Sequence, residues 1–233
     1  MKGNIVPLVT DTTSQESLAA AASTVRSREG YVSVVIACAG VTGPLTGLPQ
    51  EKTSIKELQT ALWNTPIHEF TQTMNVNVSG VFYTAVAFLD LLDAANQKFP
   101  APHPKSQVIT VSSIAGFTRG PGGPIPYCTS KAGAIHMMKQ LSTSFAPYKI
   151  RFNSIAPGFY PTEMNQNVPF IKNSPDPTVE GGVSAKISPL ERIGSAEDIN
   201  GLILFMISRA GGYLSGSVQI TDGGTLSVLP ASY

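Results

Sequence analysis

The sequence predicts an α/β fold in which a parallel sheet carries helices on both faces. Short apolar runs alternate with segments of helical periodicity along the whole chain, which is typical of parallel strands joined by crossover helices. The apolar runs are almost continuous, as in strands that are covered on both sides. With 233 residues and 42% hydrophobic content, the chain suits a single well-packed domain spanning residues 1–233.

The first elements are two strands separated by a helix. Residues 4–10, NIVPLVT, predict a strand. A helix is predicted over 14–29 because Ser14 is a suitable N-cap and Gly30 a suitable C-terminal stop. The apolar run YVSVVIACAG, 31–40, predicts the second strand.

The same alternation continues to the C-terminus. Residues 41–66 are irregular with one short helix, and Pro66 suits the first turn of a longer helix that reaches Ala95. The connection 158–194 is long for a compact domain, which is typical of a functional loop. The other predicted elements are strands at 107–113, 149–157 and 216–224 and helices at 127–146 and 196–208.

Composition argues against several classes of partner. Lys and Arg total 16 against 15 for Asp and Glu, without a basic stripe, so nucleic acid is not an expected partner. The longest apolar run, 201–208, is shorter than the roughly 18 residues of a membrane span. Two cysteines and no secretory leader predict a reduced, cytoplasmic setting. His68, His103 and His136 lack metal-ligand spacing, so no metal site is predicted.

Tyr127 and Lys131 carry the first chemical signal. Within IPYCTSKAG they lie one helical turn apart and share a face, so the ammonium approaches the phenol. A nearby positive charge favours the phenolate, which predicts a lowered pKa for Tyr127 and a proton donor that works near neutral pH.

Five ordered segments resemble the short-chain dehydrogenase/reductase family, and they are most similar to its 3-oxoacyl carrier-protein reductase type. The segments are MNVNVSGVF, VITVSSIAG, YCTSKAG, IRFNSIAPGFYPTEM, and PLERIGSAEDINGLILFMIS with YLSGSVQITDGG. The resemblance covers nearly the whole chain. It implies a Rossmann-like, doubly wound parallel sheet.

The resemblance also implies a catalytic set of Asn77, Ser113, Tyr127 and Lys131. Ser113 would hydrogen-bond a substrate carbonyl, to which Tyr127 would give a proton. Lys131 would hold the tyrosine's charge and a ribose hydroxyl. Asn77 would fix a water that feeds protons to Lys131.

The family's cofactor is NADP or NAD, and the resemblance implies which residues contact it. Thr162 and the backbone near Gly158 and Tyr160 would hold the nicotinamide amide, and Asp11 matches a position beside the adenine. The full set implied for cofactor binding is Asp11, Ala39, Gly40, Tyr127, Lys131, Gly158, Tyr160 and Thr162.

The N-terminus departs from the family pattern. Residues 4–10 match the family's third strand, so the chain lacks the first two strands and the Gly-rich turn that cradles the pyrophosphate. We therefore expect about five strands, with 4–10 pairing directly beside 31–40 and the helix 14–29 covering part of the vacated face. Cys38 also stands where the family has an asparagine.

These features predict an oxidoreductase that interconverts a ketone and a secondary alcohol, acts on a small carbonyl or alcohol, and forms a dimer or tetramer. Two alternatives stay open. Without the phosphate loop, the same residues suit a cofactor-free isomerase, dehydratase or cyclase. A non-catalytic subunit that pairs with a full-length relative is the other alternative.

Overall fold

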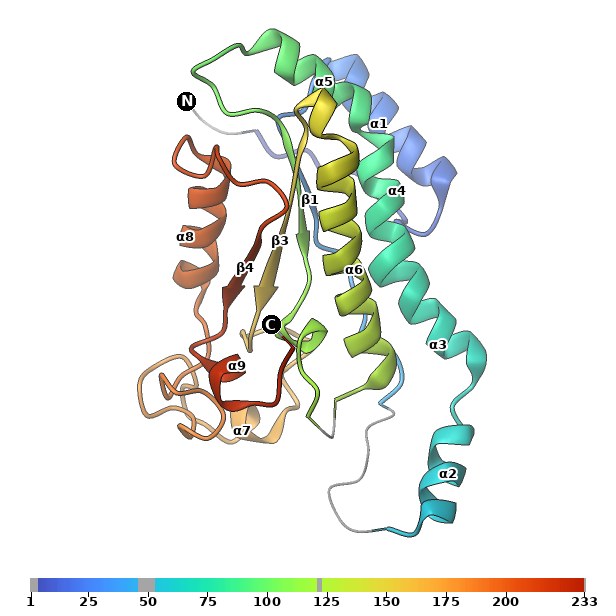
Figure 1. The fold of residues 1–233 in the computed structure, drawn as a ribbon, viewed down its shortest axis with the longest axis vertical. Coiled ribbons are helices and arrows are strands. Elements are labelled where there is room, and N and C mark those ends of the chain that lie inside the picture. Colours follow the sequence, from blue (N-terminus) through green and yellow to red (C-terminus); the bar gives the residue numbers. More distant parts are fainter. Residues whose placement is uncertain (1–3, 46–52, 121–122, 233) are drawn as a thin grey trace.

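A computed structural model of the chain describes residues 4–45, 53–120 and 123–232. Within them one parallel sheet has the strand order β1-β2-β3-β4 (Figure 1). Its strands are β1 (Val34–Ala37), β2 (Gln107–Val111), β3 (Arg151–Pro157) and β4 (Val218–Thr221). The predicted α/β class with a parallel sheet is confirmed.

Helices connect these strands and account for most of the remaining regular structure. The longer helices are α1 (Gln15–Arg28), α2 (Ile55–Trp63), α3 (Ile67–Met74), α4 (Gly80–Ala87), α5 (Leu89–Lys98), α6 (Ile125–Ser144) and α8 (Ala196–Ile207). The short ones are the π-helical turn η1 (Asn75–Ser79), η2 (Ile114–Gly116), η3 (Ala146–Tyr148), α7 (Pro169–Lys172) and α9 (Thr225–Val228).

One face of the sheet is covered by α4, α5 and α6. Val35, Val108 and Phe152 come from three adjacent strands and pack in one buried cluster with Ala85 of α4 and Met138 of α6. The strand register brings these three sheet residues into one row, because Val35 pairs with Val108 and Val108 pairs with Phe152. This cluster fixes α6, which carries Tyr127 and Lys131, against the sheet.

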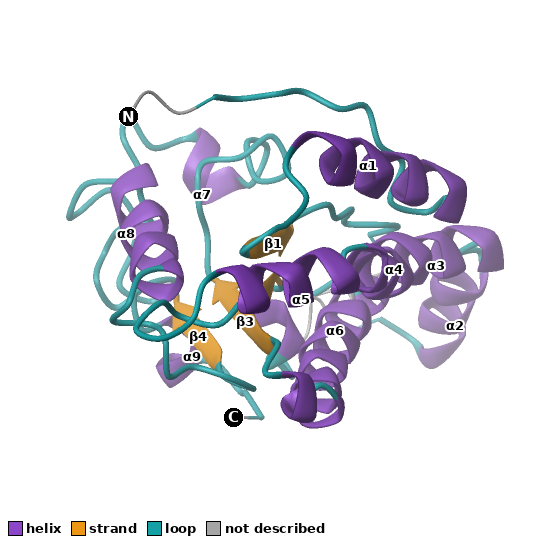
Figure 2. Ribbon diagram, turned by 90° about the horizontal axis from the view of Figure 1, so that it is seen from above, coloured by secondary structure: helices purple, strands orange, loops and turns teal. Residues whose placement is uncertain are grey.

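The opposite face is covered by α8. Ile109 and Ile155 are fully buried against Met206, and Ile203 of α8 packs on the same cluster. Helices therefore lie on both faces, as the nearly continuous apolar strands predict. Figure 2 shows α8 on one side of the strands and α4, α5 and α6 on the other.

The predicted strand at 4–10 is wrong. These residues form no strand, and Ile5 and Val9 are 94% and 106% exposed. In Figure 2 the segment runs across the top of the view to α1, apart from β1. α1 packs against α4. A lone extended segment gains neither ladder hydrogen bonds nor a buried face, so its apolar composition does not suffice to make a strand.

The predicted long helix from Pro66 to Ala95 is broken in the structure. Pro66 is the N-cap of α3, and the π-helical turn η1 separates α3 from α4. A second break lies at Phe88, whose backbone leaves helical geometry before α5 begins. No single helix in the described ranges is long and apolar enough to cross a membrane; only the bent pair Ile67–Ala87 and Leu89–Lys98 reaches that length and apolarity together.

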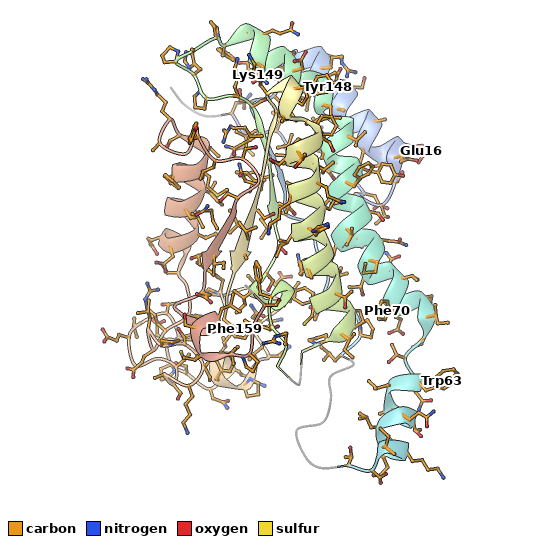
Figure 3. All side chains as sticks on the ribbon, viewed as in Figure 1. Glu16, Trp63, Phe70, Tyr148, Lys149 and Phe159 are labelled. Atoms are coloured by element: carbon orange, nitrogen blue, oxygen red, sulfur yellow. The ribbon has the colours of Figure 1, made fainter. Side chains whose placement is uncertain are left out.

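The short helix expected within 41–66 is α2, which a capping box between Ser54 and Glu57 begins. None of its described residues is buried. Figure 3 shows Trp63 at the end of α2, away from the sheet, and this side chain is 84% exposed. Trp63 is therefore not packed against a neighbouring helix.

Candidate active site

The carboxyl end of β2 places Ser113 at the start of η2. Ser113 is in an extended conformation, and its Oγ accepts a hydrogen bond from the Ala115 amide at 3.1 Å. The neighbouring Ser112 Oγ donates to the Lys131 carbonyl oxygen at 2.9 Å. This buried bond fixes the end of β2 to α6 beside the two predicted catalytic residues on that helix.

Tyr127 lies in the first turns of α6 and is half-buried. Burial raises the pKa of its phenol, and a hydrogen bond with the Ser113 side chain offsets only part of that effect. The predicted lowering of this pKa by Lys131 is therefore wrong, because desolvation is the larger influence in the folded chain. The Ser113 side chain lies close enough to the phenol to influence this pKa.

Lys131 is 5% exposed and has no acidic partner among the described residues. Its Nζ donates to the Val111 carbonyl oxygen at 3.0 Å and lies 5.5 Å from the centroid of the Tyr127 ring. Burial lowers the pKa of Lys131 to about 8, which a charge interaction with Cys38 opposes. The Lys131 ammonium therefore lies near the Tyr127 phenol, and it loses its proton at a lower pH than an exposed lysine does.

Asn77 is buried within η1, where the backbone closes a wider turn than in an α-helix. Its side chain accepts from the Val41 amide at 2.9 Å and donates to the Val41 carbonyl oxygen at 2.9 Å. Nδ2 also donates to Ser130 Oγ at 2.9 Å. Asn77 thus ties the segment that follows β1 to α6.

Gly40 lies between the two polar groups. A Cβ atom at this position would come within 3.2 Å of Lys131 Nζ and 3.3 Å of Asn77 Oδ1. The absence of a side chain therefore leaves space beside the ammonium and the amide oxygen. Asn77, Lys131, Tyr127 and Ser113 all lie around this end of the sheet.

Three residues are predicted near the nicotinamide, and the structure gives each of them different surroundings. They are Gly158, Tyr160 and Thr162. The Gly158 amide donates to the Thr221 carbonyl oxygen at 2.9 Å, so this glycine packs closely on β4. The Tyr160 hydroxyl hydrogen-bonds Thr221 Oγ1 at 2.7 Å, and burial raises the pKa of its phenol. Tyr160 lines a cavity of about 430 Å³ with Arg192, and Ser113 and Tyr127 are not part of its wall. Thr162 is exposed.

Asp11 and Ala39 are both exposed. The Asp11 carboxylate accepts from the Thr13 amide at 2.8 Å and from Thr13 Oγ1 at 2.7 Å, and these bonds lower its pKa. The turn that they form touches the start of α4, because a Cβ at Gly80 would lie 3.1 Å from Thr12 Oγ1.

The residues at the nicotinamide end fit a cofactor better than those at the phosphate end. Lys131 Nζ is a hydrogen-bond donor that a ribose hydroxyl could use, and the lack of a side chain at Gly40 keeps the position beside it free of a methyl group. In the described part of the chain, no glycine-rich turn leads from a strand into a helix to cradle a pyrophosphate.

Ser130 is a site residue that the sequence does not single out. It is completely buried, accepts from Asn77 and donates to the Tyr127 carbonyl oxygen at 2.7 Å. In the sequence, the only feature that points to Ser130 is its position directly before Lys131. A partner 53 positions away in the sequence is not predictable from helical spacing.

Comparisons with known proteins identify the family of this chain. The family model described as Enoyl-(Acyl carrier protein) reductase matches residues 1–225. The short-chain dehydrogenase/reductase PhomF from Diaporthe leptostromiformis is 41% identical over 233 residues, which cover 99% of this chain and 78% of the relative.

The chain belongs to the short-chain dehydrogenase/reductase family. It is therefore an oxidoreductase. Another relative, the acetoacetyl-CoA reductase of Synechocystis sp., is 30% identical over 93% of this chain and 77% of its own length.

Solved structures share the fold of this chain. The short-chain type dehydrogenase/reductase from Mycobacterium marinum superposes with a TM-score of 0.72 at 26% identity, covering 96% of this chain and 76% of its own. The Pseudomonas aeruginosa RhlG/NADP complex superposes with a TM-score of 0.73 at 24% identity over 93% of this chain and 75% of its own.

Proposed function

We propose that this oxidoreductase interconverts a small ketone and the corresponding secondary alcohol with a nicotinamide cofactor. The proximity of the Ser113 side chain to the Tyr127 phenol, with the buried Lys131 one helical turn away, is the observation that carries the proposal. A hydroxyl and a phenol this close can both reach a single substrate oxygen.

In the direction of reduction, Tyr127 donates its phenolic proton to the carbonyl oxygen. Ser113 hydrogen-bonds the same oxygen and stabilises the charge that develops on it. Lys131 stabilises the phenolate that remains, because its ammonium is the nearest positive charge in a buried setting. In the direction of oxidation each proton moves the opposite way.

The cofactor supplies or accepts the hydride when it is bound. Lys131 would hold a ribose hydroxyl, with Gly40 leaving the approach to its ammonium free of a side chain. Ala39, Gly158, Tyr160 and Thr162 would contact the nicotinamide end, and Asp11 would lie beside the adenine. The NADP complex of RhlG, which has the same fold, favours NADP over NAD as the first cofactor to test.

We also infer the setting in which this enzyme works. Residues 1–233 form one domain, and the enzyme acts in the cytoplasm as a dimer or tetramer. The near balance of 16 basic and 15 acidic side chains supports a small-molecule substrate over a nucleic acid.

The test is turnover by purified wild type, Tyr127→Phe and Tyr148→Phe, with NADPH absorbance as the readout. Acetoacetyl-CoA is the first probe, because a 30% identical relative is named for its reduction. Tyr148→Phe is the matched control, since this exposed tyrosine lies on η3, away from the site. We expect Tyr127→Phe to lose about 100-fold or more in kcat and the control to keep wild-type activity.

Two outcomes contradict the proposal. Equal turnover by wild type and Tyr127→Phe removes the phenol from the reaction. Turnover of a ketone or hydroxy compound by nucleotide-free protein, lost in Tyr127→Phe, points instead to cofactor-free acid–base chemistry.

A further inference from the structure

A second cavity lies at the end of the sheet opposite Ser113 and Tyr127. It has a volume of about 200 Å³ and is formed where β1, β2 and β3 begin. In Figure 1 these strands start near α5 and point toward η2 and α9. Three basic side chains, His103, Lys105 and Arg151, line the cavity, and none of its described lining residues is acidic.

Arg151 is the first residue of β3 and is 7% exposed. Its Nε donates to the Lys105 carbonyl oxygen at 3.0 Å, and Nη1 donates to the carbonyl oxygens of Gly211 and Leu214 at 3.1 and 2.9 Å. All three acceptors are neutral. The ion pairs in the described ranges involve Arg26 and Arg192 instead.

The guanidinium of Arg151 therefore carries a buried charge without an anion. It has five N–H donors, and the two on Nη2 have no partner in the described chain. Burial also lowers the pKa of Arg151, which is the expected response to an uncompensated charge. A buried charge without a counterion raises the free energy of the folded protein. Binding an anion beside Arg151 would therefore stabilise the folded state.

Ser106 is a second polar group of this cavity that lacks a partner. The side chain is 2% exposed, and its Oγ has no hydrogen-bond partner among the described residues. The backbone of Ser106 is fully used, since its amide donates to Asn96 Oδ1 at 2.7 Å and its carbonyl accepts from the Arg151 amide at 3.0 Å. The Ser106 hydroxyl is thus a second unpaired polar group among the residues that line the cavity.

The rest of the wall is apolar. Phe99 and Ile207 line the cavity, and the Phe99 ring is held between Tyr31 and His103, with ring centroids 5.1 and 5.7 Å away. One water takes about 30 Å³ in the liquid, so the cavity has room for a ligand of a few heavy atoms and is smaller than ordinary cofactor pockets.

We propose that this cavity is a binding site for a small carboxylate with a short alkyl chain. The carboxylate accepts hydrogen bonds from Arg151 Nη2 and Ser106 Oγ, and the alkyl chain lies against Phe99 and Ile207. A carboxylate suits the planar guanidinium, which binds it through parallel N–H···O bonds. The site is separate from the proposed oxidoreductase site and does not depend on it.

Sodium butyrate is the probe, and isothermal titration calorimetry with the full chain is the measurement. We expect saturable binding of butyrate and no binding of butyramide, which has the same shape without the charge. Sodium chloride at matched ionic strength controls for screening. Inorganic phosphate is the comparison that separates a carboxylate site from a general oxyanion site.

Ser106→Ala tests the site without touching Arg151. Loss of a hydrogen bond to a charged group predicts affinity for butyrate that is about tenfold weaker or more. Ser154→Ala is the matched control, because Ser154 Oγ is equally buried and equally without a partner but lies outside the cavity. Arg151→Lys keeps the positive charge but removes the planar guanidinium with its parallel N–H donors. We expect this variant to show no measurable binding.

Any of four results overturns the proposal. They are no saturable butyrate binding by the folded wild type, butyramide binding as well as butyrate, phosphate binding in place of butyrate, and unchanged affinity in Ser106→Ala. Because the calorimetric readout needs no turnover, failure here leaves the proposed oxidoreductase activity unaffected.

Discussion

Asn77 and Ser130 are joined by a buried hydrogen bond, in which Asn77 Nδ2 donates to Ser130 Oγ at 2.9 Å. The Ser130 hydroxyl in turn donates a hydrogen bond to the Tyr127 carbonyl oxygen at 2.7 Å. The π-helical turn η1 and the first turns of α6 are thereby held in one fixed arrangement. Tyr127 owes part of its position to a residue 50 positions earlier in the chain.

We expect Ser130→Ala to destabilise the fold by about 1–3 kcal/mol, because it leaves one N–H of a buried amide unpaired. Urea denaturation measures this loss. Ser144→Ala, at the exposed end of the same helix, is the control and is expected to change stability by less than about 0.5 kcal/mol. Equal stability of the two variants would show that the buried bond contributes nothing.

Gly40→Ala is expected to lower kcat while the protein stays folded. The added methyl lies 3.2 Å from Lys131 Nζ and 3.3 Å from Asn77 Oδ1, so it displaces one of the polar groups by a few tenths of an ångström. Gly201→Ala is the matched control, because it meets open space on helix α8 and is expected to stabilise by about 0.5–1 kcal/mol. Wild-type turnover in Gly40→Ala contradicts the assigned role of this glycine.

Lys131 predicts a specific dependence of stability on pH. Burial lowers the pKa of Lys131 from 10.5 to about 8, so between these values the unfolded chain binds more protons and stability rises with pH. The penalty is complete below pH 8 and amounts to about 3 kcal/mol at 1.36 kcal/mol per pKa unit.

The Lys131→Met variant isolates this contribution, because every other titrating group is shared with wild type. The free energy of unfolding of wild type relative to this variant is expected to rise by up to about 3 kcal/mol from pH 7.5 to pH 10.5. Chemical denaturation at both pH values measures it. A difference that does not change with pH means that Lys131 titrates normally.

The start of α8 provides a test of a helix cap. Ser195 Oγ accepts from the Asp198 amide, while Asp198 Oδ2 accepts from the Ser195 amide at 2.8 Å. Ser195→Ala is expected to destabilise by about 1 kcal/mol. Ser23→Ala, at an exposed position within α1, is expected to have little effect on the thermal midpoint. Coincident midpoints of the two variants would exclude a contribution from the cap.

The sequence predicted the elements that have a partner in the sheet. The apolar runs that became β2, β3 and β4 are each followed or preceded by a helix with clear end signals, such as Ser195 before α8. Local chemistry decides such boundaries, because a cap and an apolar face act within a few residues. Tyr127 and Lys131 were accessible for the same reason, since one helical turn fixes their spacing. Ser113 was implied only by the resemblance to the family.

Tertiary contacts decided what local patterns left undetermined. Residues 4–10 have the composition of a strand but no neighbour to pair with, and strand formation depends on that neighbour. The pKa of Tyr127 rises mainly because the phenol is buried, and burial is a property of the packed chain. Ser130, Ser106 and Arg151 acquired their surroundings from segments tens of residues away, so only the folded structure shows what each of them contacts.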